Sequence, residues 1–143
     1  MPIDMLPLTD ASMSGCAPVI RTDFTDDAAW KAIRRRIETP SDEGFLASVE
    51  YFDDPVYQRL TPEQILTLVP DEPQCALLIV VDAIAVASPE MPLLCIDVWE
   101  ERGRTVRVVA SELWSIENNL SIANMDFEEF AEAADEDGVY RGL

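Results

Sequence analysis

The feature that most constrains the fold is an unbroken apolar segment, CALLIVV, at residues 75–81, which ends directly at Asp82. A strand exposed to water on one face alternates apolar and polar residues, whereas a strand without alternation is buried on both faces. Such a strand lies inside a sheet that helices cover on each side. The segment therefore predicts an α/β fold with a central strand at residues 75–81.

Further strands and helices are predicted around this central strand. Strands are expected at residues 17–22, 45–52, 93–100 and 104–110. Four helices are expected from capping residues and apolar spacing. The first follows the cap Thr25 and buries Trp30, Ile33 and Ile37, and the second follows the capping box of Thr61 and Gln64. The third covers residues 111–122 and buries Leu113, Ile116 and Leu120, and the fourth follows the cap Asp126.

These elements are consistent with a single domain. Residues 1–15 are expected to form an extended arm, and residues 16–143 one α/β domain with a five-stranded mixed sheet flanked by helices. Right-handed crossovers favour a strand order such as 2-1-3-4-5, with the fifth strand antiparallel.

The last two predicted strands flank a short turn, Glu101-Arg102-Gly103, and are expected to form a C-terminal β-hairpin that is followed by two helices. A register through this turn places apolar residues opposite one another and acids opposite bases. The expected pairs are Val98 with Val106, Ile96 with Val108, Asp97 with Arg107, and Glu100 with Arg104.

The composition excludes several classes of enzyme. The 143 residues include no histidine, which excludes histidine-based triads, histidine general bases and histidine-ligated metal sites. The five glycines are not spaced as in a nucleotide-binding loop, and no cofactor is predicted. Cys16, Cys75 and Cys95 are odd in number and far apart, which favours free thiols, a reducing cytoplasmic location, and core positions for the last two. The longest apolar runs are about eight residues, so no membrane partner is expected.

Four aspartates follow predicted strands and form a candidate site. If the strands are parallel neighbours, Asp23, Asp53 with Asp54, and Asp82 converge at one edge of the sheet. Clustered carboxylates can hold Mg²⁺ and orient a phosphate, which gives the alternative of a Mg-dependent phosphoryl-transfer or nuclease-like enzyme. Aspartate after a strand is also a common cap or turn residue, and we favour that interpretation.

A basic cluster, formed by Lys31 and Arg34 to Arg36, contrasts with a net charge of −18. Direct nucleic-acid binding is not expected, because residues 41–143 carry 22 acids and 5 bases and would repel phosphates. The cluster is interpreted as a solvated helix face, with docking to an acidic surface of a partner or of another copy as the alternative.

The C-terminal third contains a candidate partner-binding surface. Residues 111–143 carry nine acids against Arg141 alone, which favours encounter with a basic protein. A tryptophan beside amide side chains can supply both buried area and directional hydrogen bonds. The candidate residues are Trp114, Glu117, Asn118, Asn119, Asn124, Glu128 and Glu132. The alternative is that the asparagines bond to backbone at a corner between two helices.

Three segments carry a resemblance to a known family. They are PVIRTDFTDDAAW, FDDPVY followed by LTPEQ, and WSIENNLSIANMDFEEFAEAADEDGVYRG. The chain resembles a family of small acidic bacterial proteins, mainly actinobacterial, that is classed as a domain of unknown function. The resemblance implies a single-domain cytosolic protein and transfers no activity.

Taken together, these features favour a non-catalytic, acidic, cytoplasmic protein that binds a basic partner protein in an immunity, regulatory or antagonist-type role. The identity of the partner and the oligomeric state stay open. In this first hypothesis charge steers the encounter and Trp114 anchors the contact.

Overall fold

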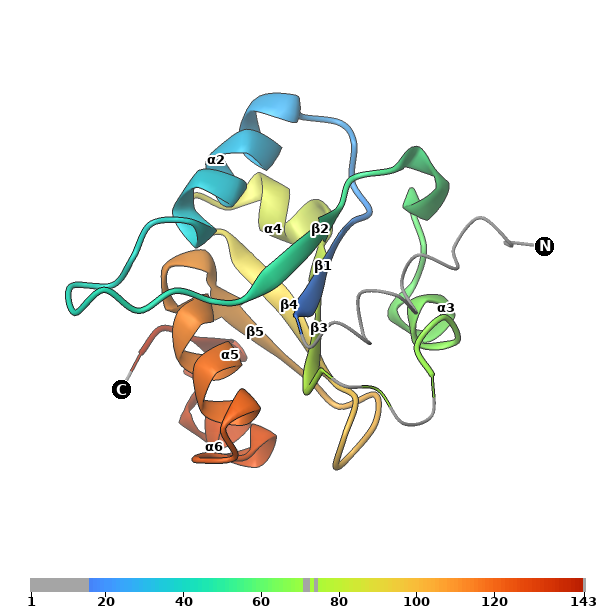
Figure 1. Cartoon of the computed structure of the whole chain (residues 1–143). Coiled ribbons are helices and arrows are strands. Elements are labelled where there is room, and N and C mark those ends of the chain that lie inside the picture. The colour runs from blue at the N-terminus through green and yellow to red at the C-terminus, as the bar shows by residue number, and fades with distance from the viewer. Residues whose placement is uncertain (1–15, 71–72, 74, 143) are drawn as a thin grey trace.

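The protein is described by a computed structural model that covers residues 16–70, 73 and 75–142, so the predicted arm at residues 1–15 lies outside the described residues. The fold is a single mixed α/β domain with a six-stranded sheet in the order β2-β1-β3-β4-β5-β6 (Figure 1). The strands are β1 (Ala17–Arg21), β2 (Val49–Phe52), β3 (Leu77–Val81), β4 (Pro92–Asp97), β5 (Thr105–Val109) and β6 (Val139–Tyr140). The helices are α2 (Asp27–Ile37), α3 (Pro62–Leu66), α4 (Ala83–Ala87), α5 (Leu113–Ser121) and α6 (Phe127–Ala133), with short 3-10 turns η2 (Pro55–Tyr57) and η3 (Ala110–Glu112).

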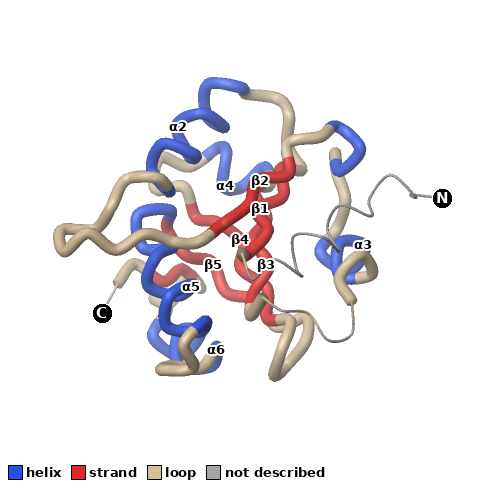
Figure 2. The backbone as a smooth tube through the Cα atoms, in the orientation of Figure 1, coloured by secondary structure: helices blue, strands red, loops and turns tan. Residues whose placement is uncertain are grey.

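The sheet separates two hydrophobic cores, as predicted from the unbroken apolar run. All five residues of β3 are buried: Leu77, Ile79 and Val81 face one core, and Leu78 and Val80 face the other. Helices α2, α4, α5 and α6 cover the first face, whereas α3 and η2 cover the second (Figures 1 and 2). Within the described residues, no helix has the length and apolar character needed to cross a bilayer.

The strand order that was expected for five strands is present, but the count and one direction differ from the prediction. The short strand β6 adds a sixth strand beside β5 and runs parallel to it. Strands β1, β2 and β3 are mutually parallel, β4 is antiparallel to β3, and β5 is antiparallel to β4. The strand that runs against the others is therefore β4, and the prediction that it would be the fifth strand was wrong.

The predicted register between the last two long strands was also wrong. Cys95, and not Val98, lies opposite Val106, which is a shift of three residues from the predicted alignment. The cause is Asp97, which is 2% exposed and whose carboxylate accepts the backbone N–H groups of residues 99, 100 and 101. This side chain ends β4 early and closes a loop longer than the predicted turn.

Helix starts follow local capping rules with one correction. The capping box of Thr61 and Gln64 and the cap Asp126 are present as predicted. The cap of α2 is Asp26 and not Thr25, because the N–H and hydroxyl of Thr25 both donate to the Asp23 carboxylate. The helix α4 was not predicted; its cap is Asp82.

The predicted strand at residues 45–52 is shorter than expected. β2 begins only at Val49, and the preceding residues lie in a loop. In that loop the Leu46 carbonyl accepts from Asn118 and the Ser48 N–H donates to Glu117, so α5 takes backbone groups that a longer strand would offer to the sheet. This loop positions the candidate site.

Candidate functional site

Helix α5 is the element that builds the candidate site. Leu113, Ile116 and Leu120 are buried in the core, as the spacing predicted. Trp114 lies beside this stripe, is partly exposed, and stacks on Phe45 with 5.4 Å between ring centroids and 12° between ring planes. The stack joins α5 to the loop that precedes β2.

Glu117 and Asn118, both on α5, hold that loop through hydrogen bonds to its backbone. Glu117 is 3% exposed, and its Oε1 accepts the Ser48 N–H at 2.8 Å and the Asn118 amide at 2.9 Å. Its Oε2 accepts the Ser121 hydroxyl at 2.6 Å, and the Asn118 amide also donates to the Leu46 carbonyl at 2.8 Å. Both residues were predicted to contact a partner. The Glu117 carboxylate is buried and bonded within the protein, and the Asn118 amide donates within it.

The loop is also closed on itself. The Ser41 N–H donates to the Phe45 carbonyl, and the Phe45 N–H donates to the Ser41 hydroxyl. Gly44 has a φ of +91°, a backbone conformation that favours glycine, and its N–H donates to the Ser41 carbonyl. This closed loop holds Phe45 and Leu46 at 49% and 45% exposure. We call Phe45, Leu46 and Trp114 the aromatic patch.

Acidic residues accompany the aromatic patch. Asp42 and Glu43, in the same loop as Phe45, are exposed. Together with Trp114 and Glu112 they line a shallow cavity of about 410 Å³. Burial raises the pKa of the Glu112 carboxyl above its usual range. In Figure 1 the loop between α2 and β2 projects from the left side of the molecule, so it is open to approach.

The asparagines at the end of α5 form the helix corner that was the alternative reading. The Asn119 amide donates to the Ser115 carbonyl at 2.8 Å, and its side-chain oxygen accepts the Asn124 amide at 2.8 Å. Its backbone carbonyl accepts the N–H groups of Asn124 and Met125. These bonds turn the chain from α5 towards α6.

The remaining predicted partner residues lie at or near α6. Asn124, Glu128 and Glu132 are exposed. The Glu128 carboxylate lies 3.7 Å from the Arg104 guanidinium, a weak exposed ion pair. These residues are available to solvent but are not joined to the aromatic patch by any contact described above.

The strand-end aspartates are divided between different arginines. The Asp53 carboxylate accepts from Arg21 at 3.1 Å and from the Trp30 indole at 3.2 Å. Asp82 caps α4 and makes a two-pronged contact with Arg107 at 3.0 and 2.7 Å. Among the described residues, no group of three or more His, Cys, Asp or Glu side chains is placed to hold a metal ion.

Arg21 organises the acids at this edge of the sheet. It is 4% exposed, and besides Asp53 it contacts the Asp27 carboxylate at 2.7 Å and the Asp23 backbone carbonyl at 3.1 Å. Hydrogen bonding and charge from Arg21 lower the pKa of Asp27, whereas the pKa of Asp23 is lowered first by its hydrogen bonds from Thr25. Asp54 caps η2 by accepting the Val56 N–H. The aspartates therefore have structural roles as caps and ion-pair partners.

Phe45 and Leu46 were not among the predicted partner-binding residues. They were assigned to a strand because they continue its apolar pattern, although Pro40, Ser41, Asp42 and Gly44 just before them are turn-forming residues. That cluster of turn formers was the available signal for a loop.

Comparison with curated proteins finds no match. A family model described as a domain of unknown function, DUF6924, matches residues 16–143. The match covers every strand and helix described above. The chain belongs to this family of domains of unknown function.

Proposed function

We propose that this protein is a non-catalytic binding protein that holds a basic partner protein at the aromatic patch. The observation that carries the proposal is the Phe45–Trp114 stack. Phe45 lies on a loop whose backbone is hydrogen-bonded to side chains of α5. Exposed apolar side chains on a soluble domain are typical of interaction sites when they lie together. Immunity, regulatory or antagonist-type roles all fit such a protein.

The loop that carries Phe45 favours binding because its conformation is already fixed before a partner arrives. Ordering a flexible loop on association costs free energy, and a loop already held in one conformation avoids this cost. Here Ser41, Glu117 and Asn118 hold the backbone on either side of Phe45. In this proposal Glu117 and Asn118 act by positioning the patch, and the contacts come from Phe45, Leu46 and Trp114.

The charge of the protein favours a basic partner. The net charge is −18, and Asp42 and Glu43 are exposed beside Phe45. Complementary charge speeds encounter and makes it salt-dependent, while a few buried anchors supply most of the affinity. Glu128 and Glu132 on α6 extend the negative charge of the surface, and in this proposal they speed the encounter with the partner without anchoring it.

The bonding of the strand-end aspartates supports this function over the alternative of a Mg-dependent enzyme. Asp53 and Asp82 are neutralised by Arg21 and Arg107 respectively. A shared metal ion needs carboxylates that converge on one point, at about 2.1 Å from the ion for Mg²⁺.

The test is to capture partners with the protein, purify the captured protein, and measure its affinity for variants by calorimetry. The partner should have a basic isoelectric point. Phe45→Ser and Trp114→Ala should each weaken binding by more than about 1 kcal/mol, the threshold for a significant interface residue. Ile84→Ser is the matched control, because Ile84 is an equally apolar side chain, 56% exposed on α4.

The variants must keep their fold, which circular dichroism checks. Raising the salt concentration should slow association more than it speeds dissociation, because steering acts on the encounter. A captured protein that is acidic, or one that binds the Phe45→Ser variant as tightly as the Ile84→Ser control, would contradict the proposal.

A further inference from the structure

A second cavity lies on the side of α2 that faces the segment after α4, with a volume of about 600 Å³. Its walls come from parts of the chain that are far apart. They are Arg35, Arg36 and Thr39 at the end of α2, Met91 after α4, Val109 at the end of β5, Ser111 just after it, and Arg141 near the C-terminus. We call this cavity the arginine cleft. Its volume is in the range of sites for small organic ligands.

Three arginines line this cleft, and two of them, Arg35 and Arg36, have no ion-paired acid among the described residues. Among the described residues, no carboxylate or carbonyl is hydrogen-bonded to, or ion-paired with, the guanidinium of Arg35 or Arg36. The other arginines except Arg59 are engaged with carboxylates or backbone carbonyls: Arg21, Arg34, Arg102, Arg104, Arg107 and Arg141. With 28 acids to 10 basic residues, two neighbouring free arginines in one cleft are an exception.

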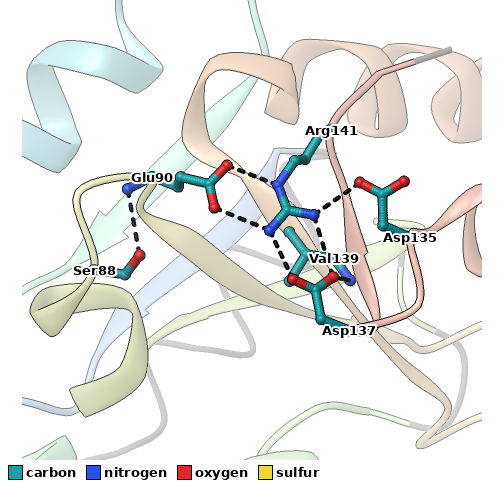
Figure 3. A network of polar contacts seen from close by, with 6 residues as sticks. All are labelled: Ser88, Glu90, Asp135, Asp137, Val139 and Arg141. Carbon is teal, nitrogen blue, oxygen red and sulfur yellow. Dashed lines mark hydrogen bonds and ion pairs between the residues drawn. The ribbon is translucent and has the colours of Figure 1, made fainter.

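Among the described residues that line the arginine cleft, the one acid, Glu90, is bonded to Arg141, which also lines the cleft, as Figure 3 shows. The Glu90 carboxylate makes a two-pronged contact with Arg141, at 2.6 and 2.9 Å. Arg141 is also bonded to Asp135 at 2.8 Å and to Asp137 at 2.7 Å. The hydrogen bonds from Arg141 lower the pKa of Glu90, and the Glu90 carboxylate makes no described ion pair with Arg35 or Arg36.

The remaining lining residues of the arginine cleft offer both an apolar surface and a hydroxyl group to a ligand. Met91 and Val109, with Ala32, offer an apolar surface, and Ser111 offers a hydroxyl. Guanidinium groups bind phosphate oxygens through paired, charge-assisted hydrogen bonds. We propose that the arginine cleft binds a small organic phosphate monoester, with Arg35 and Arg36 on the phosphate and the apolar wall against the organic group.

The net negative charge of the protein does not prevent this binding. Glu90, Asp135 and Asp137 are ion-paired with Arg141 at the wall of the cleft. At physiological ionic strength the Debye length is about 8 Å, so acids farther away are largely screened, whereas the guanidinium groups of Arg35 and Arg36 act at contact distance. A long polyanion would meet the acidic surface beyond the cleft, and a small dianion would not. The arginine cleft adjoins the cavity beside the aromatic patch, because Arg36, Thr39 and Ser111 line both. Its ligand is a different one, and the inference does not depend on the proposed function.

The test is a calorimetric titration with phenyl phosphate at physiological ionic strength. Saturable binding of one equivalent is expected, and Arg35→Gln combined with Arg36→Gln should weaken it at least about 10-fold. The charge-matched control is Lys31→Gln combined with Arg59→Gln, which removes two positive charges outside the cleft and should change the affinity less than about 2-fold. The four substituted side chains, those of Lys31, Arg35, Arg36 and Arg59, are all exposed and take part in no described ion pair, so the fold should persist.

Two further probes separate the chemistry of the ligand. Inorganic phosphate should bind more weakly than phenyl phosphate because it lacks the group that contacts Met91 and Val109. Benzoate should also bind more weakly, because it carries one charge. Absence of saturation up to about 10 mM phenyl phosphate, equal losses in the two double variants, or benzoate binding as tightly as phenyl phosphate would overturn the proposal.

Discussion

Replacing Glu117 with alanine should release the loop before β2 from α5 and destabilise the protein by about 3 kcal/mol. The carboxylate accepts hydrogen bonds from Ser48, Asn118 and Ser121. A hydrogen bond to a charged group contributes about 1.5–3 kcal/mol. Three such bonds at the low end amount to about 4.5 kcal/mol. Because Ser48 and Ser121 are exposed, water replaces part of the lost bonding, and the variant no longer bears the cost of burying a carboxylate, so a net loss of about 3 kcal/mol is expected.

The measurement is urea denaturation together with amide hydrogen exchange of the native protein. The Ser48 amide should exchange much faster in Glu117→Ala, since its acceptor is gone, and Glu117→Gln should lose about 1 kcal/mol because one carbonyl acceptor stays. Glu132→Ala, at an exposed position on α6, serves as the control and should change stability by less than about 0.5 kcal/mol. Unchanged exchange at Ser48 in Glu117→Ala would refute the view that this carboxylate holds the loop.

Two other predictions concern acid and metal ions. Arg141 holds the pKa values of Glu90 and Asp137 below their usual range. Their contribution to stability is therefore present above about pH 4.3 and is lost as the pH falls through the lowered pKa values of the folded state. In Arg141→Gln, the melting temperature should fall less steeply with decreasing pH below that point. An unchanged slope would contradict the assignment. Mg²⁺ at about 1 mM should raise the melting temperature by less than about 1 °C, whereas a site with a Kd near 10 μM would add about 2.7 kcal/mol. A rise of several degrees that Asp53→Asn abolishes would restore the enzyme hypothesis.

Local signals in the sequence predicted the parts of the fold that depend on neighbouring residues. The buried run of β3, the capping box at Thr61 and the cap Asp126 are each determined within a few residues, and the structure contains all three. The same holds for the buried side of α5. Periodicity and capping are sufficient in such places because the decisive contacts are close in sequence.

The errors arise where a side chain is used by a distant segment or by an unexpected backbone group. Arg107 was paired with Asp97 on charge, but Asp97 closes its own loop and Arg107 binds Asp82. Glu117 was predicted to bind a partner, yet it is buried and accepts a hydrogen bond from the Ser48 N–H, 69 residues away. Such long-range uses of a carboxylate leave no pattern in the local sequence.

The double burial of β3 has a consequence for how the molecule unfolds. Leu77 and Ile79 belong to the core under α2 and α5, while Leu78 and Val80 belong to the core under α3. Neither core keeps its central strand if the other opens, so the two cannot melt as independent units. We therefore expect a single cooperative transition, with probes on the α3 side and on the α5 side giving the same midpoint.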